Sequence, residues 1–359
     1  MRSTLSTLIC VVAAALFVTT ANAAFDLTKR NNLVLYWGQN AHGSYDSTPE
    51  KQQQDLLTYC MDTNVDLISV GFLNTWNGTG NQPIVNFANA CTGYQMFPGT
   101  ELLWCPTISA DIRACQAMGK KILISIGGST ATYEGFETAA QADAFAYQIW
   151  NMFGRGWSYY RPFGEAIVDG FDLDIETLPA LFYEKFAYRL RVLFEADKTR
   201  KYIMTAAPQC MNPDQHLESA LSKVAFDAVF VQFYNNPSCA ASAWKTKGQP
   251  QLTNAGFNFG MWNNWVATNS KNKNLKVFMT LAGGGKVAPA GGYVSKAVAA
   301  SIIADLARFP TFGGVAMWDA SEAWVNAGYV AAVKDALNKL PAMVKRRNFF
   351  GMWPTSAML

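Results

Sequence analysis

The sequence predicts a single domain built as a parallel (β/α)8 barrel, on two observations. Its 359 residues, half of them hydrophobic, can bury a large core. Eight apolar, β-branched runs recur, each followed by a segment typical of a helix or loop, which is the element order of such a barrel. A doubly wound sheet is the alternative. The predicted strands cover residues 32–37, 65–73, 121–126, 166–175, 202–207, 226–234, 275–281 and 314–318. The predicted helices cover residues 49–60, 108–118, 139–153, 181–194, 255–268, 294–308 and 320–340.

The net charge and the aromatic content indicate which kinds of molecule the protein binds. With 29 basic and 26 acidic side chains, the formal net charge is only +3. The electrostatic footprint of a nucleic-acid binder is therefore missing, and we expect no nucleic-acid partner. Aromatic residues make up 13% of the chain and charged residues only 15%. That balance suits surfaces that stack on carbohydrate, although an aromatic-rich core explains most of these rings.

The N-terminal residues 1–23 have the features of a secretory signal peptide. A basic start is followed by an apolar run from Leu8 to Val18 and by small residues ending at Ala23. The run is too short for a membrane anchor. We therefore expect a secreted, extracellular and monomeric protein with no membrane contact after cleavage. The catalytic barrel would cover residues 24–340, and residues 341–359 would form a short flexible tail.

An acidic cluster marks the fourth predicted strand, residues 167–176. Because side chains alternate along a strand, Asp172, Asp174 and Glu176 share one face, while Asp169 has the opposite parity. If that face points into the barrel, the three carboxylates cannot all ionise cheaply, and at least one proton is retained near neutral pH. Glu176 is closest to the carboxyl end of the strand, where a general acid meets substrate. A buried structural network or a metal site is the alternative.

The spacing Asp-x-x-Asp-x-Asp-x-Glu of this cluster resembles the signature of family 18 glycoside hydrolases, the chitinases. A second signature of that family, Ser-x-Gly-Gly, occurs at residues 125–128, at the end of the third predicted strand. Glycine at Gly127 and Gly128 would let a sugar approach the backbone closely. The resemblance runs over about 25–340 and touches at least six of the eight strands.

The cysteines are consistent with an exported protein. Cys10 lies in the predicted signal peptide, so 7 − 1 = 6 cysteines remain. An even number favours disulfides, although six cysteines alone leave the pairing open. A zinc site is the alternative, but no Cys-x-x-Cys pair occurs and only His42 and His216 could assist; we expect no metal. The cysteine arrangement resembles that of the hevamine-like, class III branch of the family. That resemblance implies the pairs Cys60–Cys115, Cys91–Cys105 and Cys210–Cys239.

The resemblance implies an endochitinase that cleaves chitin or chitin oligosaccharides with retention of configuration and without a cofactor. Family 18 uses substrate-assisted catalysis. Glu176 would protonate the glycosidic oxygen while the substrate's own acetamide attacks the anomeric carbon. Asp174 would stabilise the positive charge that develops on the acetamide. Asp172 would share a proton with Asp174, and Tyr234 would hold the acetamide oxygen.

Further residues would bind the sugar chain. The resemblance places Trp318 beneath the reacting sugar, Tyr36 on the floor of the cleft and Asn86 against a distal sugar. Gln232 has the same parity as Tyr234 and should point inward beside it. The resemblance also implies cis peptide bonds at Gly71–Phe72 and Trp318–Asp319.

Three features stand outside this pattern. A glycine run, Gly283, Gly284 and Gly285, follows the seventh predicted strand where relatives often carry a Pro-Ala-type sequence, and Asp319 replaces the serine of many relatives. Asn77 opens an Asn-Gly-Thr acceptor for N-glycosylation.

Two other functions use the same barrel. A non-catalytic lectin or enzyme inhibitor commonly lacks the acid or its partners, whereas this sequence keeps them. An endo-β-N-acetylglucosaminidase acting on N-glycans uses similar acids, and only its substrates distinguish it.

Overall fold

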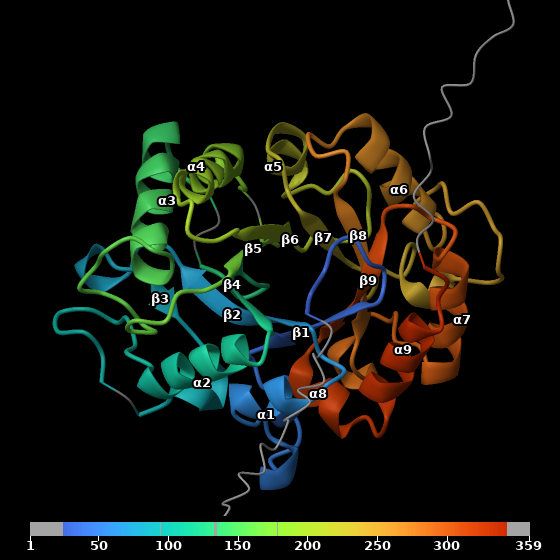
Figure 1. Ribbon diagram of the computed structural model, residues 1–359, viewed down its shortest axis with the longest axis horizontal. Helices are drawn as coiled ribbons and strands as arrows, with labels where there is room; N and C mark the ends of the chain where they lie inside the picture. The colour runs from blue at the N-terminus through green and yellow to red at the C-terminus, as the bar shows by residue number, and fades with distance from the viewer. Residues whose placement is uncertain (1–23, 94, 133–134, 178, 343–359) are drawn as a thin grey trace, which may run out of the picture.

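The eight predicted strands form a closed parallel barrel in the computed structural model, which describes residues 24–93, 95–132, 135–177 and 179–342 (Figure 1). The predicted signal peptide and the tail from residue 343 lie outside the described residues. Pairing of β1 with both β2 and β9 closes the barrel. The barrel strands are β1 (Asn32–Trp37), β2 (Leu67–Thr75), β4 (Lys121–Gly127), β5 (Gly170–Asp174), β6 (Ile203–Ala206), β7 (Ala228–Gln232), β8 (Lys276–Ala282) and β9 (Phe312–Trp318). A short strand that the sequence did not predict, β3 (Ile84–Val85), runs antiparallel to β2.

The helices lie outside the strands (Figure 1). They are α1 (Leu56–Met61), α2 (Pro106–Ala117), α3 (Ala139–Phe153), α4 (Tyr183–Ala196), α5 (Glu218–Lys223), α6 (Phe259–Thr268), α7 (Lys296–Leu306), α8 (Ala320–Val325) and α9 (Tyr329–Asn338). Short 3₁₀ turns are η1 (His42–Ser44), η2 (Pro49–Lys51), η3 (Thr79–Asn81), η4 (Ala88–Cys91), η5 (Ala241–Ala243) and η6 (Gly285–Val287).

Two predicted helices are wrong in detail. The helix expected over 49–60 is η2 followed by α1, because Gln52 has an extended backbone with φ −65° and ψ 158°. The helix expected over 320–340 is α8 followed by α9, because Gly328 takes a left-handed conformation with φ 70°. Glycine adopts that conformation without steric cost. Helix α5 was not predicted.

The alternation expected for β5 is confirmed. Phe171 and Leu173 belong to the large apolar cluster that also contains the buried faces of the helices. Asp172 points the other way, since it accepts hydrogen bonds from side chains on β1, β2, β4 and β6. Asp169, of opposite parity, lies 3.1 Å from Lys121 Nζ and accepts from Gln116 Nε2 at 2.8 Å.

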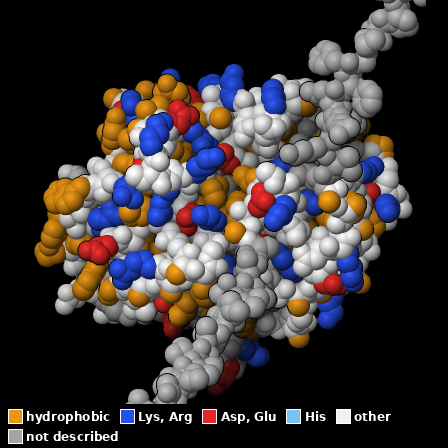
Figure 2. Space-filling model, viewed as in Figure 1, with side chains coloured by type: hydrophobic (Ala, Val, Ile, Leu, Met, Phe, Trp, Pro, Cys, Tyr) orange, Lys and Arg blue, Asp and Glu red, His pale blue; other side chains and the backbone are white. Residues whose placement is uncertain are grey.

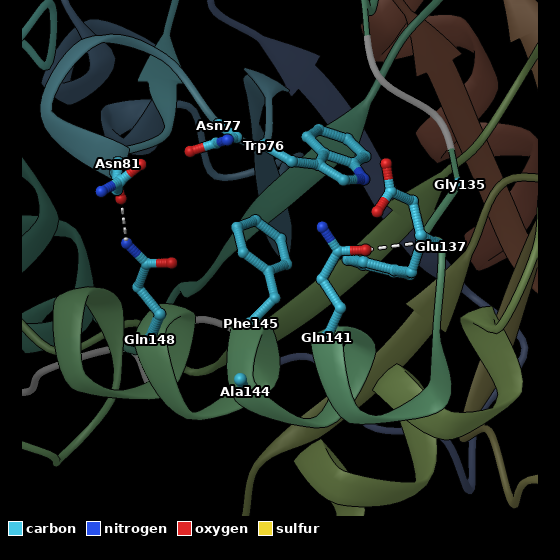
Figure 3. Close-up of a pocket in the computed structure, with 10 residues that line it drawn as sticks. Trp76, Asn77, Asn81, Gly135, Glu137, Gln141, Ala144, Phe145 and Gln148 are labelled. Atoms are coloured by element: carbon cyan, nitrogen blue, oxygen red, sulfur yellow. Dashed lines mark hydrogen bonds between the residues drawn. The ribbon is translucent and has the colours of Figure 1, made fainter.

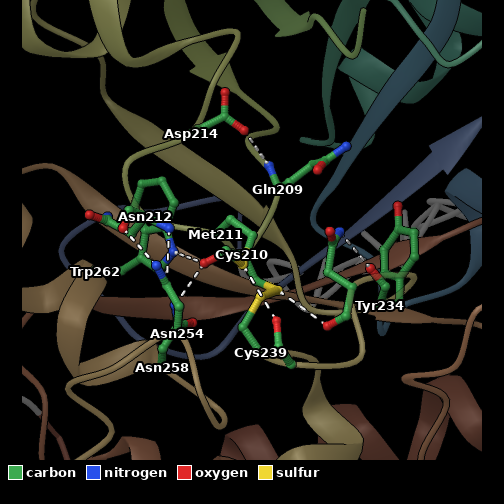
Figure 4. The surroundings of a disulfide bond; sticks show 12 residues. Gln209, Cys210, Met211, Asn212, Asp214, Tyr234, Cys239, Asn254, Asn258 and Trp262 are labelled. Atoms are coloured by element: carbon green, nitrogen blue, oxygen red, sulfur yellow. Dashed lines mark hydrogen bonds between the residues drawn. A yellow bond between two sulfur atoms is a disulfide. The ribbon is translucent and has the colours of Figure 1, made fainter.

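Three disulfides join the segments around the barrel, with the pairing that the resemblance implied. They are Cys60–Cys115, Cys91–Cys105 and Cys210–Cys239. The last joins the loops that follow β6 and β7, close to Tyr234 (Figure 4). Across the described ranges, no helix is both long and apolar enough to cross a membrane.

Candidate active site

The deepest acid of the cluster is Asp172, which is completely buried. Its Oδ2 atom accepts hydrogen bonds from Tyr36 Oη at 2.9 Å, Ser125 Oγ at 2.7 Å and Ser69 Oγ at 3.3 Å. Its Oδ1 atom accepts from Thr205 Oγ1 at 2.5 Å. Burial raises the pKa of Asp172, and these hydroxyl donors offset part of that rise because they stabilise the ionised form.

Asp174 lies one step nearer the mouth of the barrel and is also buried. Its Oδ1 atom accepts a hydrogen bond from Gln232 Nε2 at 2.9 Å, so both side chains point inward as expected. Burial, followed by the negative charges of Glu176 and Asp172, raises the pKa of Asp174 well above its ordinary value. The direction of this shift is the one expected if the cluster retains a proton, which stays a prediction.

The outer end of the cluster carries Glu176 and Tyr234. Glu176 follows the end of β5 and is half-buried. Burial, together with the charges of Asp174 and Glu176, raises the pKa of Tyr234 well above its ordinary value. The phenol therefore keeps its proton at neutral pH and can donate a hydrogen bond to a ligand beside the acids.

Aromatic rings form the floor beside these acids. The Trp318 ring stacks on Phe72, with centroids 5.7 Å apart and an interplanar angle of 24°. It also contacts the buried Tyr36 ring at 5.8 Å. The peptide bonds Gly71–Phe72 and Trp318–Asp319 are cis, as the resemblance implied. The site therefore combines a carboxylate cluster with an apolar ring surface.

Comparison with known families agrees with this arrangement. The family model described as glycosyl hydrolases family 18 matches residues 32–295. The chain belongs to glycosyl hydrolase family 18. The matched region contains the acids, Tyr234 and seven of the eight barrel strands.

Two curated relatives are named chitinases. Class III chitinase of Arthroderma benhamiae is 37% identical over 354 residues, covering 97% of this chain and 98% of that protein. Chitinase 2 of Rhizopus oligosporus is 42% identical over 299 residues, covering 83% of this chain. The chain spans only 51% of that Rhizopus protein's length.

Two solved structures share the fold. The ICChI chitinase of Ipomoea carnea is 29% identical with a TM-score of 0.68, covering 85% of this chain and 99% of that one. A xylanase and α-amylase inhibitor protein, XAIP-II of Scadoxus multiflorus, is 27% identical with a TM-score of 0.67. The match covers 84% of this chain and 97% of that one. This fold therefore occurs both in a protein described as a chitinase and in one described as an inhibitor.

Gly128 of the second family 18 signature is also required by packing. It has φ +87°, and a Cβ atom placed on it would lie 2.7 Å from Phe72 Cδ2. The space beside Gly128 is thus filled by the ring that supports Trp318, so packing requires the glycine. A sugar contact at Gly128 stays a prediction.

Asn86 lies at the edge of the site. Its backbone exchanges hydrogen bonds with Phe72, at 2.8 and 2.9 Å, and its side-chain Oδ1 accepts from the Ala88 amide at 2.8 Å. The side chain is exposed. Its contact with a distal sugar also stays a prediction.

The two departures from the family 18 pattern meet at α8. Asp319 is buried, and its carboxylate accepts from the Ala41 amide and the Glu322 amide, both at 3.0 Å. It therefore caps α8 and also holds the loop after β1, which needs the two oxygens of a carboxylate. A Cβ atom on Gly284 would lie 2.0 Å from Glu322 Oε1. The glycine run thus leaves room for Glu322, whose Oε2 is 2.7 Å from Nδ1 of His42.

Sequence reasoning missed the hydroxyl groups around Asp172 and one further acid. Ser69, Ser125 and Thr205 are hydroxyl residues inside otherwise apolar strands, a signal that could have found them. Asp214 gave no such signal, because it lies in a loop. It is buried, accepts from the Gln209 amide at 2.9 Å (Figure 4), and contributes to the raised pKa of Asp174 after burial and the nearer acids.

A groove of about 420 Å³ lies apart from the acids, between the segment after β2 and α3 (Figure 3). Rings of Trp76 and Phe145 and the amides of Gln141 and Gln148 line it. The exposed Asn77 side chain, the glycosylation candidate, borders the same groove. Over the described part of the chain, no cluster of three or more His, Cys, Asp or Glu side chains is arranged to hold a metal ion.

Proposed function

We propose that the protein is an endochitinase that hydrolyses β-1,4-linked N-acetylglucosamine polymers. The observation that carries the proposal is the row of Asp172, Asp174 and Glu176 along and just after β5, with Asp174 buried and hydrogen-bonded to Gln232 Nε2 at 2.9 Å. Carboxyl groups in different environments can take different roles: the outer Glu176 acts as the acid, and the buried Asp174 stabilises the charge that develops on the substrate. The names of the curated relatives point to the same substrate.

The reaction is substrate-assisted and proceeds with retention. Glu176 gives its proton to the glycosidic oxygen as the bond to the anomeric carbon breaks, and the substrate's acetamide oxygen bonds to that carbon. The resulting oxazolinium carries a positive charge, which Asp174 stabilises by accepting its N–H after passing a proton to Asp172. Water then adds to the anomeric carbon as the bond from that carbon to the acetamide oxygen breaks, and the water gives a proton to Glu176.

The remaining site residues position the sugar. Tyr234 donates to the acetamide oxygen, which fits its retained proton. Trp318 and Tyr36 exclude water beneath the reacting ring. Further contacts come from Gln232, Gly128 and Asn86. No cofactor takes part.

We also propose export and glycosylation. The three disulfides suit an oxidising compartment, which supports a secreted, extracellular protein. Asn77 is exposed and would accept an N-linked glycan there. The mature protein would be a monomer.

Hydrolysis of chitin oligosaccharides, with product size and anomeric form followed, tests the proposal. The wild type should release β-anomers, and Glu176→Gln should lose turnover while keeping its fold and its affinity for the oligosaccharide. Glu165→Gln is the matched control, because the Glu165 side chain is 94% exposed. Turnover by Glu176→Gln would remove Glu176 as the acid.

An inhibitor or lectin is the second candidate, favoured by the similarity to XAIP-II. Binding of chitin oligosaccharides or of a xylanase by the wild type, with no cleavage of any sugar, would establish it. Cleavage of N-glycans but not of chitin oligosaccharides would instead identify an endo-β-N-acetylglucosaminidase.

A further inference from the structure

Four large side chains stand exposed on two segments, 96–104 and 157–159, that contact each other through Phe97 and Tyr159. Trp157 is 82% exposed, Tyr159 63%, Met96 53% and Trp104 42%. We call these four residues the aromatic platform. Figure 2 shows hydrophobic side chains gathered at the left edge of this face, where Figure 1 places the segment that precedes α2. Large apolar side chains that form a contiguous exposed patch often mark an interaction site.

One half of the platform is a small hairpin. The bridge between Met96 and Leu103 and the hydrogen bond from the Trp104 amide to the Gln95 carbonyl, at 3.0 Å, define it. The disulfide Cys91–Cys105 closes its base. Trp104 and Met96 are therefore held on a stiff support.

The other half is the loop that connects α3 to β5. The Cys105 amide donates to the Pro162 carbonyl at 2.8 Å, which ties the loop to the base of the hairpin. Phe97 of the hairpin contacts the rings of Tyr159 and Tyr160, both at 5.7 Å. Between the two halves lies a groove of about 490 Å³, lined by Gln95, Met96, Phe97, Pro98, Trp104 and Tyr159.

The platform is poor in available charge. Segments 95–104 and 154–164 contain three charged side chains, and the protein itself engages two of them; the exposed Glu165 follows directly and is opposite in charge to Arg155. Glu101 accepts from Thr79 Oγ1 at 2.6 Å. Arg161 donates to five backbone carbonyls of its own loop and the flanking elements. Arg155 is the third. Such a surface suits an uncharged polymer better than a nucleic acid or an acidic protein.

We propose that the aromatic platform is a second carbohydrate-binding surface, which holds N-acetylglucosamine chains at the face of solid chitin while the barrel cleaves. Pyranose rings present C–H groups that stack on aromatic faces, and rings held rigidly lose little entropy on binding. The inference rests on the proposed function for its ligand.

The platform is physically continuous with the edge of the active site. Asn86 pairs with Phe72, which stacks on Trp318. Directly after Asn86 the chain runs through η4 to Cys91, which the disulfide joins to the hairpin. Backbone pairing at Asn86 and the disulfide Cys91–Cys105 therefore tie the platform to the segment that borders the cleft.

The test compares binding to chitin powder with cleavage of soluble chitotetraose. Trp104→Ala/Trp157→Ala should partition onto chitin powder about tenfold more weakly than wild type, equivalent to about 1.4 kcal/mol for two rings. Its kcat and KM for chitotetraose should stay unchanged. Trp104→Phe/Trp157→Phe should keep most of the binding, because it keeps rings. Tyr188→Ala, which removes a ring 59% exposed on α4, is the matched control and should bind as wild type.

Binding is measured in a Glu176→Gln background, so that no chitin is consumed. Unchanged partition of the double Ala variant, or an equal loss in Tyr188→Ala, would overturn the inference. If the double Ala variant differed from the wild type in sedimentation coefficient but not in chitin binding, the inference would be overturned. The platform would then be an interface between two copies of the chain. Failure of the proposed function is a separate result, namely absence of chitotetraose cleavage by the wild type.

Discussion

Thr205→Val should show how strongly the hydroxyl groups stabilise the buried Asp172 carboxylate. The substitution removes the 2.5 Å hydrogen bond from Thr205 Oγ1 to Oδ1 and keeps the branched shape of the side chain. A hydrogen bond to a charged group contributes about 1.5–3 kcal/mol. Asp172 is completely buried, so solvent does not screen this bond. We expect the free energy of unfolding at neutral pH to fall by about 2 kcal/mol.

The pH dependence of that loss separates charge from packing. The bond favours ionised Asp172, so its contribution is present when the carboxyl is ionised and disappears as pH falls through the pKa of Asp172. That pKa is raised above its ordinary 3.8, so the loss should begin to shrink above that pH. Urea unfolding of both proteins over a series of pH values measures the difference.

Two further variants make the result decisive. Ser69→Ala removes the longest of the four bonds, 3.3 Å, and should cost much less than Thr205→Val. In an Asp172→Asn background the cost of Thr205→Val should fall as well, because the charge is gone. An equal cost at every pH and in that background would refute the reasoning and leave Thr205 as a packing residue.

Three other substitutions test separate parts of the structure. Asp174→Asn should make the decline in stability above pH 3.8 shallower, since an acid whose pKa is raised by folding favours the unfolded state on ionising; other buried acids with raised pKa values, such as Asp319, keep part of the decline. Urea midpoints at about pH 4 and pH 8 check this. A slope in the variant as steep as in the wild type would contradict it. Gly128→Ala should destabilise by about 1–3 kcal/mol more than Gly93→Ala in thermal or urea unfolding. Both glycines have positive φ, but only the first would clash with Phe72. Asn77→Gln should remove an endoglycosidase-sensitive mass increment from protein secreted by a eukaryotic host, and wild type lacking that increment would exclude the site.

Much of the barrel could be predicted because its signals are local. The strand β1 and the helix α3 have the predicted bounds, since apolar runs and periodicity mark them directly. The inward face of Asp172 and Asp174 follows from alternation alone. Strand β3, only two residues long, carries no pattern that a sequence could reveal.

What could not be predicted depends on contacts between distant segments. The hydroxyl groups of Ser69 and Thr205 reach Asp172 only through the pairing of strands that are distant in sequence. The reason for Gly128 is the Phe72 ring, which lies on another strand. The capping role of Asp319 likewise depends on the Ala41 amide, 278 positions away. The disulfide pairing came from family resemblance and not from the spacing of the cysteines.

The barrel can close only late in the synthesis of the chain. Asn32 on β1 pairs with Gly314 on β9, so the first strand made waits for almost the whole chain before it gains its second neighbour. Until β9 emerges, β1 and β8 both expose open edges, which invite pairing between nascent chains. A chain truncated before Phe312 should therefore be captured by chaperones or aggregate, although every acid of the cluster is already synthesised.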